Sequence, residues 1–87
     1  MQTVKFIGSS IRFHRRKAGL TQIGLACLAG VGKASIFDVE KGKESVQLDT
    51  LLKILSVLNM ELDVKSPLMG EFLTTTGVQP PYGEGRA

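Results

Sequence analysis

The sequence is poor in the side chains that catalysis and metal binding use, because its 87 residues include one cysteine, Cys27, and one histidine, His14. A single cysteine cannot close a disulfide within the chain, and one histidine beside it cannot complete a metal-binding cluster. No nucleophile–base pair is visible either, so we expect a protein that is not an enzyme and has no cofactor. We interpret His14 as a partly buried residue on the inner side of a helix.

The sequence also lacks any apolar run near the ~18 residues that a membrane-spanning helix needs. Its first ten residues lack the basic start and the apolar core of a signal peptide, which predicts a cytoplasmic protein without a membrane partner. The chain length corresponds to one domain. The shares of apolar (43%) and charged (22%) residues are typical of a folded domain and not of a disordered chain.

Acidic side chains are scarce in the first half of the chain. Residues 1–43 contain eight Lys or Arg side chains and two Asp or Glu side chains, which gives a formal charge of +6. Residues 44–87 contain three Lys or Arg side chains and six Asp or Glu side chains, which gives a formal charge of −3. This division is typical of a protein that meets a polyanion with one side, although chance placement of surface charges explains it equally well.

Helical periodicity dominates the first two thirds of the chain. Side chains of low polarity recur at steps of three and four from residue 4 to residue 18, which predicts a first helix that Gly19 ends. Thr21 is a favourable N-cap for a second helix that runs to residue 29 and stops at Gly30. A third helix is expected from residue 33 to residue 41, where Gly42 ends it. Two short helices joined in this way match the helix-turn-helix unit.

A fourth helix is expected over residues 48–58, and its apolar side is unusually wide. The leucines that we assign to the core side are Leu48, Leu51, Leu52, Leu55 and Leu58. Ile54 and Val57 extend the apolar arc past half of the circumference, whereas one face of a small domain needs only about 100°. The surplus predicts a second burial surface, for which a second copy of the chain is the simplest occupant.

The period changes to strict alternation after Asn59, which predicts one short strand over residues 60–65. A lone strand has no partner in its own chain, so we expect it to pair antiparallel with the same strand of a second subunit. The residues expected at this homodimer interface are Ile54, Val57, Met60, Leu62 and Val64. All three prolines and four of the ten glycines lie in residues 66–87, which we interpret as a flexible tail after a domain of residues 1–65.

Several motifs together resemble a known family. They are Ile11-Arg12, Gly19-Leu20-Thr21-Gln22, Leu25-Ala26, Gly30-Val31, Glu40-Lys41-Gly42-Lys43, Leu48 and Leu51-Leu52. In this order and spacing, residues 7–58 resemble the DNA-binding domain of phage Cro and lambda-type repressors. The resemblance implies an all-α domain of five helices that binds double-stranded operator DNA as a homodimer.

The segment Leu58-Asn59-Met60-Glu61-Leu62-Asp63-Val64 is similar to that of HipB-type antitoxins, in which a strand after the last helix pairs across the dimer. That resemblance implies a repressor of its own operon that also binds a HipA-type kinase toxin. A stand-alone phage-like or restriction-controller repressor without a toxin is the alternative. A protein-interaction adaptor that uses the fold without DNA is a third hypothesis, which the basic first half disfavours.

The resemblance also assigns roles to single residues. Gln22 matches a glutamine that binds a backbone phosphate and braces the recognition helix. Arg15 and Glu40 match a structural ion pair between the first and third helices. The positions that face or flank base edges are Lys33, Ala34, Ser35, Phe37 and Asp38. Further phosphate contacts are expected from Arg12, Lys41 and Lys43. Lys41 and Lys43 lie on either side of Gly42, where their ammonium groups and the free backbone amides can bind phosphate.

Each of these roles has a plainer alternative. A lysine can donate to guanine, an alanine methyl can pack on a thymine methyl and an aspartate can accept from cytosine, but Lys33 and Asp38 can also be solvated surface residues. Gln22 can be an ordinary side chain at the start of a helix. Arg12 lies in a basic stripe that can be a solvated face, and Lys41 and Lys43 can belong to a solvated loop.

Overall fold

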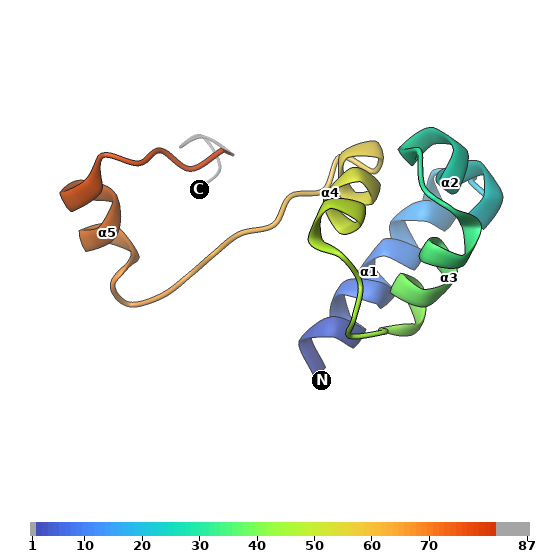
Figure 1. Cartoon of the computed structure of the whole chain (residues 1–87), viewed down its shortest axis with the longest axis horizontal. Coiled ribbons are helices and arrows are strands. Elements are labelled where there is room, and N and C mark those ends of the chain that lie inside the picture. The colour runs from blue at the N-terminus through green and yellow to red at the C-terminus, as the bar shows by residue number, and fades with distance from the viewer. Residues whose placement is uncertain (1, 82–87) are drawn as a thin grey trace.

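The computed structural model describes residues 2–81, and within them it contains five helices and no strand. The helices are α1 (Gln2–Lys17), α2 (Gln22–Ala29), α3 (Lys33–Lys41), α4 (Leu48–Val57) and α5 (Met69–Thr76). Helices α1 to α4 pack together, whereas α5 lies at the far end of an extended segment (Figure 1). The all-helical class is confirmed. The resemblance implied five helices within the domain of residues 1–65, but residues 2–65 contain four, and α5 lies inside the range 66–87 that was interpreted as a tail.

The ends of α2 and α3 follow from their caps. The Thr21 side chain accepts a hydrogen bond from the amide of Gly24 at 2.9 Å, which satisfies one of the amides that a helix start leaves without a partner. Gly30 and Gly42 end the two helices in the left-handed conformation, with φ of 72° and 85°. A residue with a side chain rarely adopts this conformation, so these glycines fix where the helices stop.

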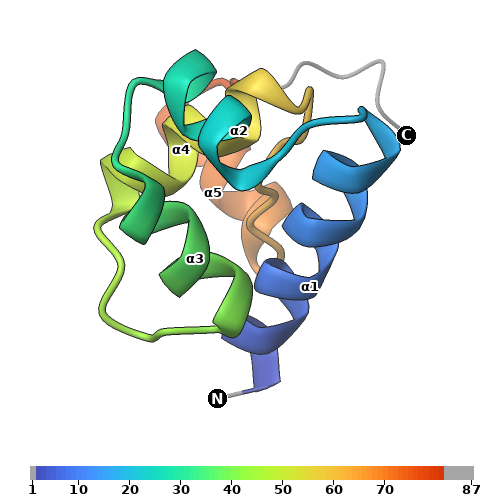
Figure 2. The same ribbon diagram turned by 90° about the vertical axis from the view of Figure 1, so that its right-hand side faces the viewer.

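A single apolar core lies among the first four helices. Its buried residues are Ile11, Leu25, Ala26, Ile36, Val39, Leu51, Ile54 and Leu55. The helix pairs with substantial contact are α1–α3, α2–α3, α2–α4 and α3–α4, so α5 has at most marginal contact with another helix. Figure 2 shows α1, α2 and α3 facing the viewer with α5 behind them.

Helices α1 and α3 approach each other closely at Gly8. A Cβ atom on Gly8 would lie 2.3 Å from the carbonyl oxygen of Val39 and 3.0 Å from that of Glu40. Both neighbours are backbone atoms, which cannot move aside as the end of a long side chain can. The absence of a side chain at Gly8 therefore sets the distance between α1 and the C-terminal half of α3.

The structure corrects the prediction for His14, which is exposed and not partly buried. Its Nδ1 atom lies 2.7 Å from the carbonyl oxygen of Ser10, one turn earlier on the same helix. The inner position next to it belongs to Arg15, which is the one buried charged residue in the described chain. The buried line on α1 therefore runs through Ile11 to Arg15, because a partner on α3 draws the arginine inward.

The structure also corrects the prediction that Ile54 lies at a dimer interface. Ile54 is 0% exposed within a single chain, where it belongs to the central core. Leu48 and Leu52, which were assigned to the core side of α4, are instead exposed. The apolar arc of α4 is so wide that its period does not locate its centre, and contact with α2 selects the Leu51–Ile54–Leu55 side.

Residues 60–65, where a strand was predicted, have an extended path without regular secondary structure (Figure 1). Met60 and Leu62 are half-buried and pack against the core of their own chain, whereas Val64 is 65% exposed. The alternation of the sequence therefore matches the burial at Met60 and Leu62 but not at Val64. Strand formation and pairing with a second subunit remain predictions.

Candidate nucleic-acid interface

Helices α2 and α3 have the geometry of a helix-turn-helix unit. A turn of residues 30–32 joins them, and the two helices are bent relative to each other by 113°. The unit is defined by a crossing of about 90–120° and a short turn that often contains glycine. No single helix in residues 2–81 is long and apolar enough to cross a membrane, and α2 and α3 satisfy that test only as a bent pair.

Helix α3 presents one side to the core and the other to solvent. Ile36 and Val39 are buried, whereas Lys33, Ala34 and Phe37 are exposed. Among the other predicted contact residues, Lys41 and Lys43 are exposed, and Ser35 and Asp38 are half-buried beside the turn that leads to α4. The structure therefore brings most of the predicted base-contact residues onto one accessible surface of a single helix.

The ion pair between Arg15 and Glu40 joins α1 to α3. Arg15 donates from Nε to Glu40 Oε2 at 2.6 Å and from Nη2 to Glu40 Oε1 at 3.1 Å. Its Nη1 also donates to the carbonyl oxygen of Leu20 at 2.8 Å, in the turn before α2. The two side chains are only 11% and 5% exposed, so little solvent weakens the pair. One guanidinium thus ties together α1, the turn before α2 and α3.

Gln22 extends this network from the start of α2. Its Nε2 donates to Glu40 Oε1 at 3.2 Å, so Glu40 accepts from both Arg15 and Gln22. Glu40 lies in the last turn of α3, beside the exposed surface of that helix, and the network therefore ties the C-terminal end of α3 to α1 and α2. The predicted bracing role of Gln22 has a direct structural counterpart, while its phosphate contact remains a prediction.

The turn after α3 differs from the prediction in one respect. The amide of Gly42 donates to the carbonyl oxygen of Val39, and the amide of Lys43 donates to that of Asp38, both at 3.0 Å. These amides complete the C-cap of α3 and are not free to meet a phosphate. The Lys43 ammonium lies 3.4 Å from Asp38 Oδ2, so two predicted DNA contacts form an exposed ion pair with each other.

Two lysine–phenylalanine pairs lie on the surface. The Lys41 ammonium lies 4.9 Å from the centre of the Phe37 ring on α3, and the Lys17 ammonium lies 5.7 Å from that of Phe13 on α1. Both distances are within the range of a cation–π contact. Arg12 lines a depression of about 470 Å³ with Phe13, Lys17 and other residues of α1, together with Glu40.

Three features of this site were not found from the sequence. They are the close approach at Gly8, the hydrogen bond from Arg15 to Leu20, and the Lys41–Phe37 contact. Gly8 carries a signal, because a glycine inside a helix costs about 1 kcal/mol relative to alanine and calls for a packing reason. The hydrogen bond from Arg15 to Leu20 forms only when the helices have packed together, so local sequence does not predict it. Phe37 and Lys41 are four residues apart on one helix, and this spacing permits a contact without requiring it.

Known proteins are similar to this chain in sequence. A family model described as helix-turn-helix matches residues 11–65, which is more than half of the chain. The chain belongs to the helix-turn-helix family. The resemblance that the sequence shows to helix-turn-helix repressors is thereby confirmed at the level of the family. In helix-turn-helix proteins the second helix of the unit lies in the major groove of DNA, and here that helix is α3.

Two relatives within this family have curated names. The chain is 36% identical over 67 residues to the uncharacterized HTH-type transcriptional regulator y4mF of Sinorhizobium fredii, a match that covers 77% of this chain and 88% of the relative. It is 40% identical over 50 residues to an uncharacterized HTH-type transcriptional regulator of Haemophilus influenzae. That match covers 58% of this chain and 51% of the relative.

Proposed function

We propose that the protein is a sequence-specific DNA-binding repressor that reads an operator with the exposed surface of α3. The observation that carries the proposal is the way α3 is held: Ile36 and Val39 pack in the core, Glu40 in the last turn is tied to Arg15 and Gln22, and the outer side of the helix is accessible. The match to the helix-turn-helix family and the names of its relatives support the same function.

Direct readout of bases follows from the side chains on α3. Lys33, at the start of the helix, donates to guanine O6 and N7, and Asp38 accepts from cytosine N4. Ser35 lies next to Asp38, and Ala34 and Phe37 offer apolar contact. Lys33 has no acidic residue beside it in the first turn of α3 to offset the helix dipole, so an external anion or acceptor stabilises its charge.

Phosphate contacts fix the position of α3 in the groove. We assign them to Gln22, Lys41 and Lys43, which lie at the ends of α2 and α3, and to Arg12 on α1. These contacts supply affinity without sequence information, so their loss weakens binding to every duplex by a similar factor. The basic character of residues 1–43 suits this role.

The proposal is tested by selection of duplexes from a random-sequence pool, followed by binding measurements on the selected site. We expect Lys33→Ala to cost about 1–3 kcal/mol of binding free energy on that site and to relax the preference at one base position. Gln22→Ala and Lys43→Ala serve as matched controls, because they should weaken selected and unrelated duplexes evenly. Failure to enrich any sequence, or an unchanged base preference in Lys33→Ala, would contradict the assignment of α3.

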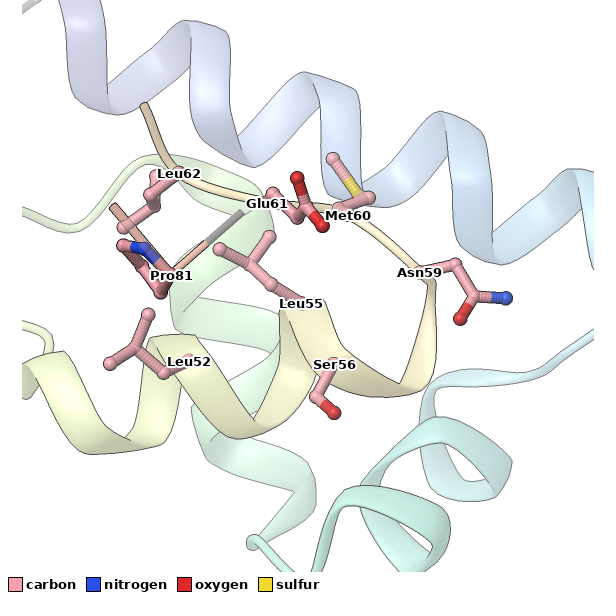
Figure 3. Close-up of a pocket in the computed structure, with 8 residues that line it drawn as sticks. All are labelled: Leu52, Leu55, Ser56, Asn59, Met60, Glu61, Leu62 and Pro81. Atoms are coloured by element: carbon pink, nitrogen blue, oxygen red, sulfur yellow. The ribbon is translucent and has the colours of Figure 1, made fainter. Parts of the chain in front are cut away.

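We further propose that the protein acts as a homodimer, joined through residues 60–64. A groove of about 500 Å³ runs along this segment, and Leu52, Leu62 and Pro81 lie around it in Figure 3. Pairing of the segment with its copy about a two-fold axis is antiparallel, and it covers apolar side chains at this groove.

The revised interface comprises Val57, Met60, Leu62 and Val64, without the buried Ile54. Two copies of α3 then read a roughly palindromic site whose halves are one helical turn (about 34–36 Å) or a multiple of it apart.

The finer proposal is that the repressor is an antitoxin that binds a HipA-type kinase toxin and represses their shared operon. Besides the resemblance of residues 58–64, it is supported by exposed apolar side chains on and around α5, namely Leu68, Phe72 and Val78. Co-purification with the product of the neighbouring reading frame, combined with footprinting on the native promoter, tests it. A footprint without a co-purifying protein would favour the stand-alone repressor instead.

A further inference from the structure

The exposed surface of α3 has an apolar centre between its charged ends. Phe37 is 47% exposed, whereas Ile36 and Val39 of the same helix are buried in the core of the domain. Ala34 is also exposed and precedes Phe37 by three residues. At 100° per residue the two side chains differ by about 60° around the helix, so they form one apolar strip. This strip lies where the proposed function places the edges of bases.

The Phe37 ring has a neighbour that is not part of the core. The Lys41 ammonium lies over the ring, 4.9 Å from its centre, and it comes from one turn later on the same helix. At an exposed site such a contact is weak, and it leaves the edge and the other face of the ring for contact. The aromatic side chain therefore has an accessible surface although a lysine lies over it.

We propose that Phe37, with Ala34 beside it, recognises the C5-methyl group of a thymine in the major groove. The inference rests on the proposed function of α3. Thymine presents the one apolar group on the major-groove edges of the four bases, and phenylalanine and alanine are among the side chains that pack against it. The other edges offer donors and acceptors and, on cytosine, a C5–H group that is much smaller than the methyl group of thymine. A phenyl ring placed against a donor or acceptor would displace the water bound to it without supplying a new hydrogen bond. Phe37 therefore disfavours a base other than thymine at the position that it contacts.

The test changes a single methyl group in the DNA. From the duplex selected by the wild-type protein, a series is made in which each thymidine in turn is replaced by deoxyuridine, which has the same hydrogen-bonding groups. We expect the wild type to lose about fourfold in affinity for each methyl group that Phe37 contacts. Phe37→Ala should bind more weakly and should no longer distinguish thymidine from deoxyuridine at that position, while keeping any discrimination due to Ala34.

Phe13→Ala is the matched control. Phe13 is also an exposed phenylalanine with a lysine over its ring, but it lies on α1 and not on α3. Its replacement should leave the discrimination between thymidine and deoxyuridine unchanged at every position. Phe37→Gln is a second variant, which keeps a side chain of moderate length and isolates the loss of the apolar ring from the loss of bulk.

Three results would overturn the inference: a wild type indifferent to deoxyuridine at every position, a Phe37→Ala variant with wild-type discrimination throughout, or a selected site without thymine. Each of them is obtained on a duplex that the protein does select, so the proposed function stands when the inference fails. Absence of any selected duplex would contradict the proposed function itself and is seen before the first substitution is made.

Discussion

Residues 2–58 and residues 59–81 differ in how their apolar side chains are covered. Every buried hydrophobic residue of the described chain lies between Ile11 and Leu55. The later segment has apolar side chains as well, but Leu68, Phe72 and Val78 are exposed, and α5 has at most marginal contact with another helix. The first region buries a core within one chain although some of its apolar side chains are exposed, whereas the apolar side chains of residues 59–81 are at most half-buried.

The contrast shows what a short helix needs. Helices α2 and α5 have eight residues each, which is below the ~12–15 residues at which isolated helices become stable in water. Helix α2 is stabilised by packing of Leu25 and Ala26 and by its cap at Thr21. No side-chain cap is present at the start of α5. We therefore expect α2 to unfold with the whole domain and α5 to open locally at much lower free energy.

The largest expected effect concerns the network that holds α1 and α3 together. Arg15→Met and Glu40→Gln should each cost about 3–5 kcal/mol of unfolding free energy, because each change leaves a poorly solvated charge without its partner. Chemical denaturation of the single variants and of the double variant gives the coupling energy. The double variant should be far more stable than the sum of the two losses implies. A coupling energy near zero would show that the two charges do not interact in solution.

The next effect concerns the proposed dimer. Val64→Glu places a charge on the apolar side of residues 60–64, at a side chain that is 65% exposed in the single chain. Burial of one aliphatic side chain contributes about 1.5–3 kcal/mol, so this substitution should shift the protein toward monomer without unfolding it. Leu62→Glu should act in the same direction and should also destabilise the fold, since Leu62 packs on its own core.

Light scattering at micromolar concentration measures the outcome, with Ser66→Glu as a control that adds the same charge just outside the segment. Operator affinity should fall together with the mass of the particle, because a monomer holds only one half-site. The interface would be wrong if the wild type were monomeric, or if Val64→Glu remained a stable dimer.

A pair of glycines compares the two regions directly. In Gly8→Ala the new methyl group meets two backbone oxygens, and we expect a loss of about 1–3 kcal/mol despite the better helix propensity of alanine. In Gly70→Ala, within α5, the new methyl group meets nothing within 4 Å apart from the adjacent backbone of its own helix. There the helix itself should gain up to about 1 kcal/mol while the melting temperature of the domain stays constant. Equal melting temperatures for the two variants would remove the distinction between the regions.

Local sequence rules predicted those elements whose ends are set by local chemistry. Thr21, Gly30 and Gly42 gave the bounds of α2 and α3, because caps act within a few residues. The side of α1 that faces the core was misplaced toward His14. The buried residue next to His14 is the charged Arg15, which pairs with Glu40. A pattern of hydrophobic residues does not reveal such a buried ion pair, because its members are polar.

Other parts depend on contacts that local rules do not contain. The wide apolar arc of α4 placed Ile54 at an interface, and only the position of α2 shows that it belongs to the core. Helix α5 was missed because glycine and proline are frequent after residue 66. Most of the candidate DNA-binding surface was predicted from spacing and resemblance, whereas the contact of Lys41 with Phe37 required the structure.

The smallest expected effect concerns the end of the chain. Deletion of residues 70–87 removes most of α5, whose apolar side chains are exposed, so it should change the unfolding free energy of the remaining domain by less than about 0.5 kcal/mol. Pro81 borders the groove beside Leu52 and Leu62, and its loss leaves that groove more open. Thermal unfolding at a fixed protein concentration measures the stability, and light scattering on the same sample checks the dimer. A fall in melting temperature of many degrees would mean that this segment covers the body of the domain, in its own chain or in its partner, and that the two regions form one cooperative unit. Unchanged stability with a lost protein partner would assign the exposed side of α5 to binding.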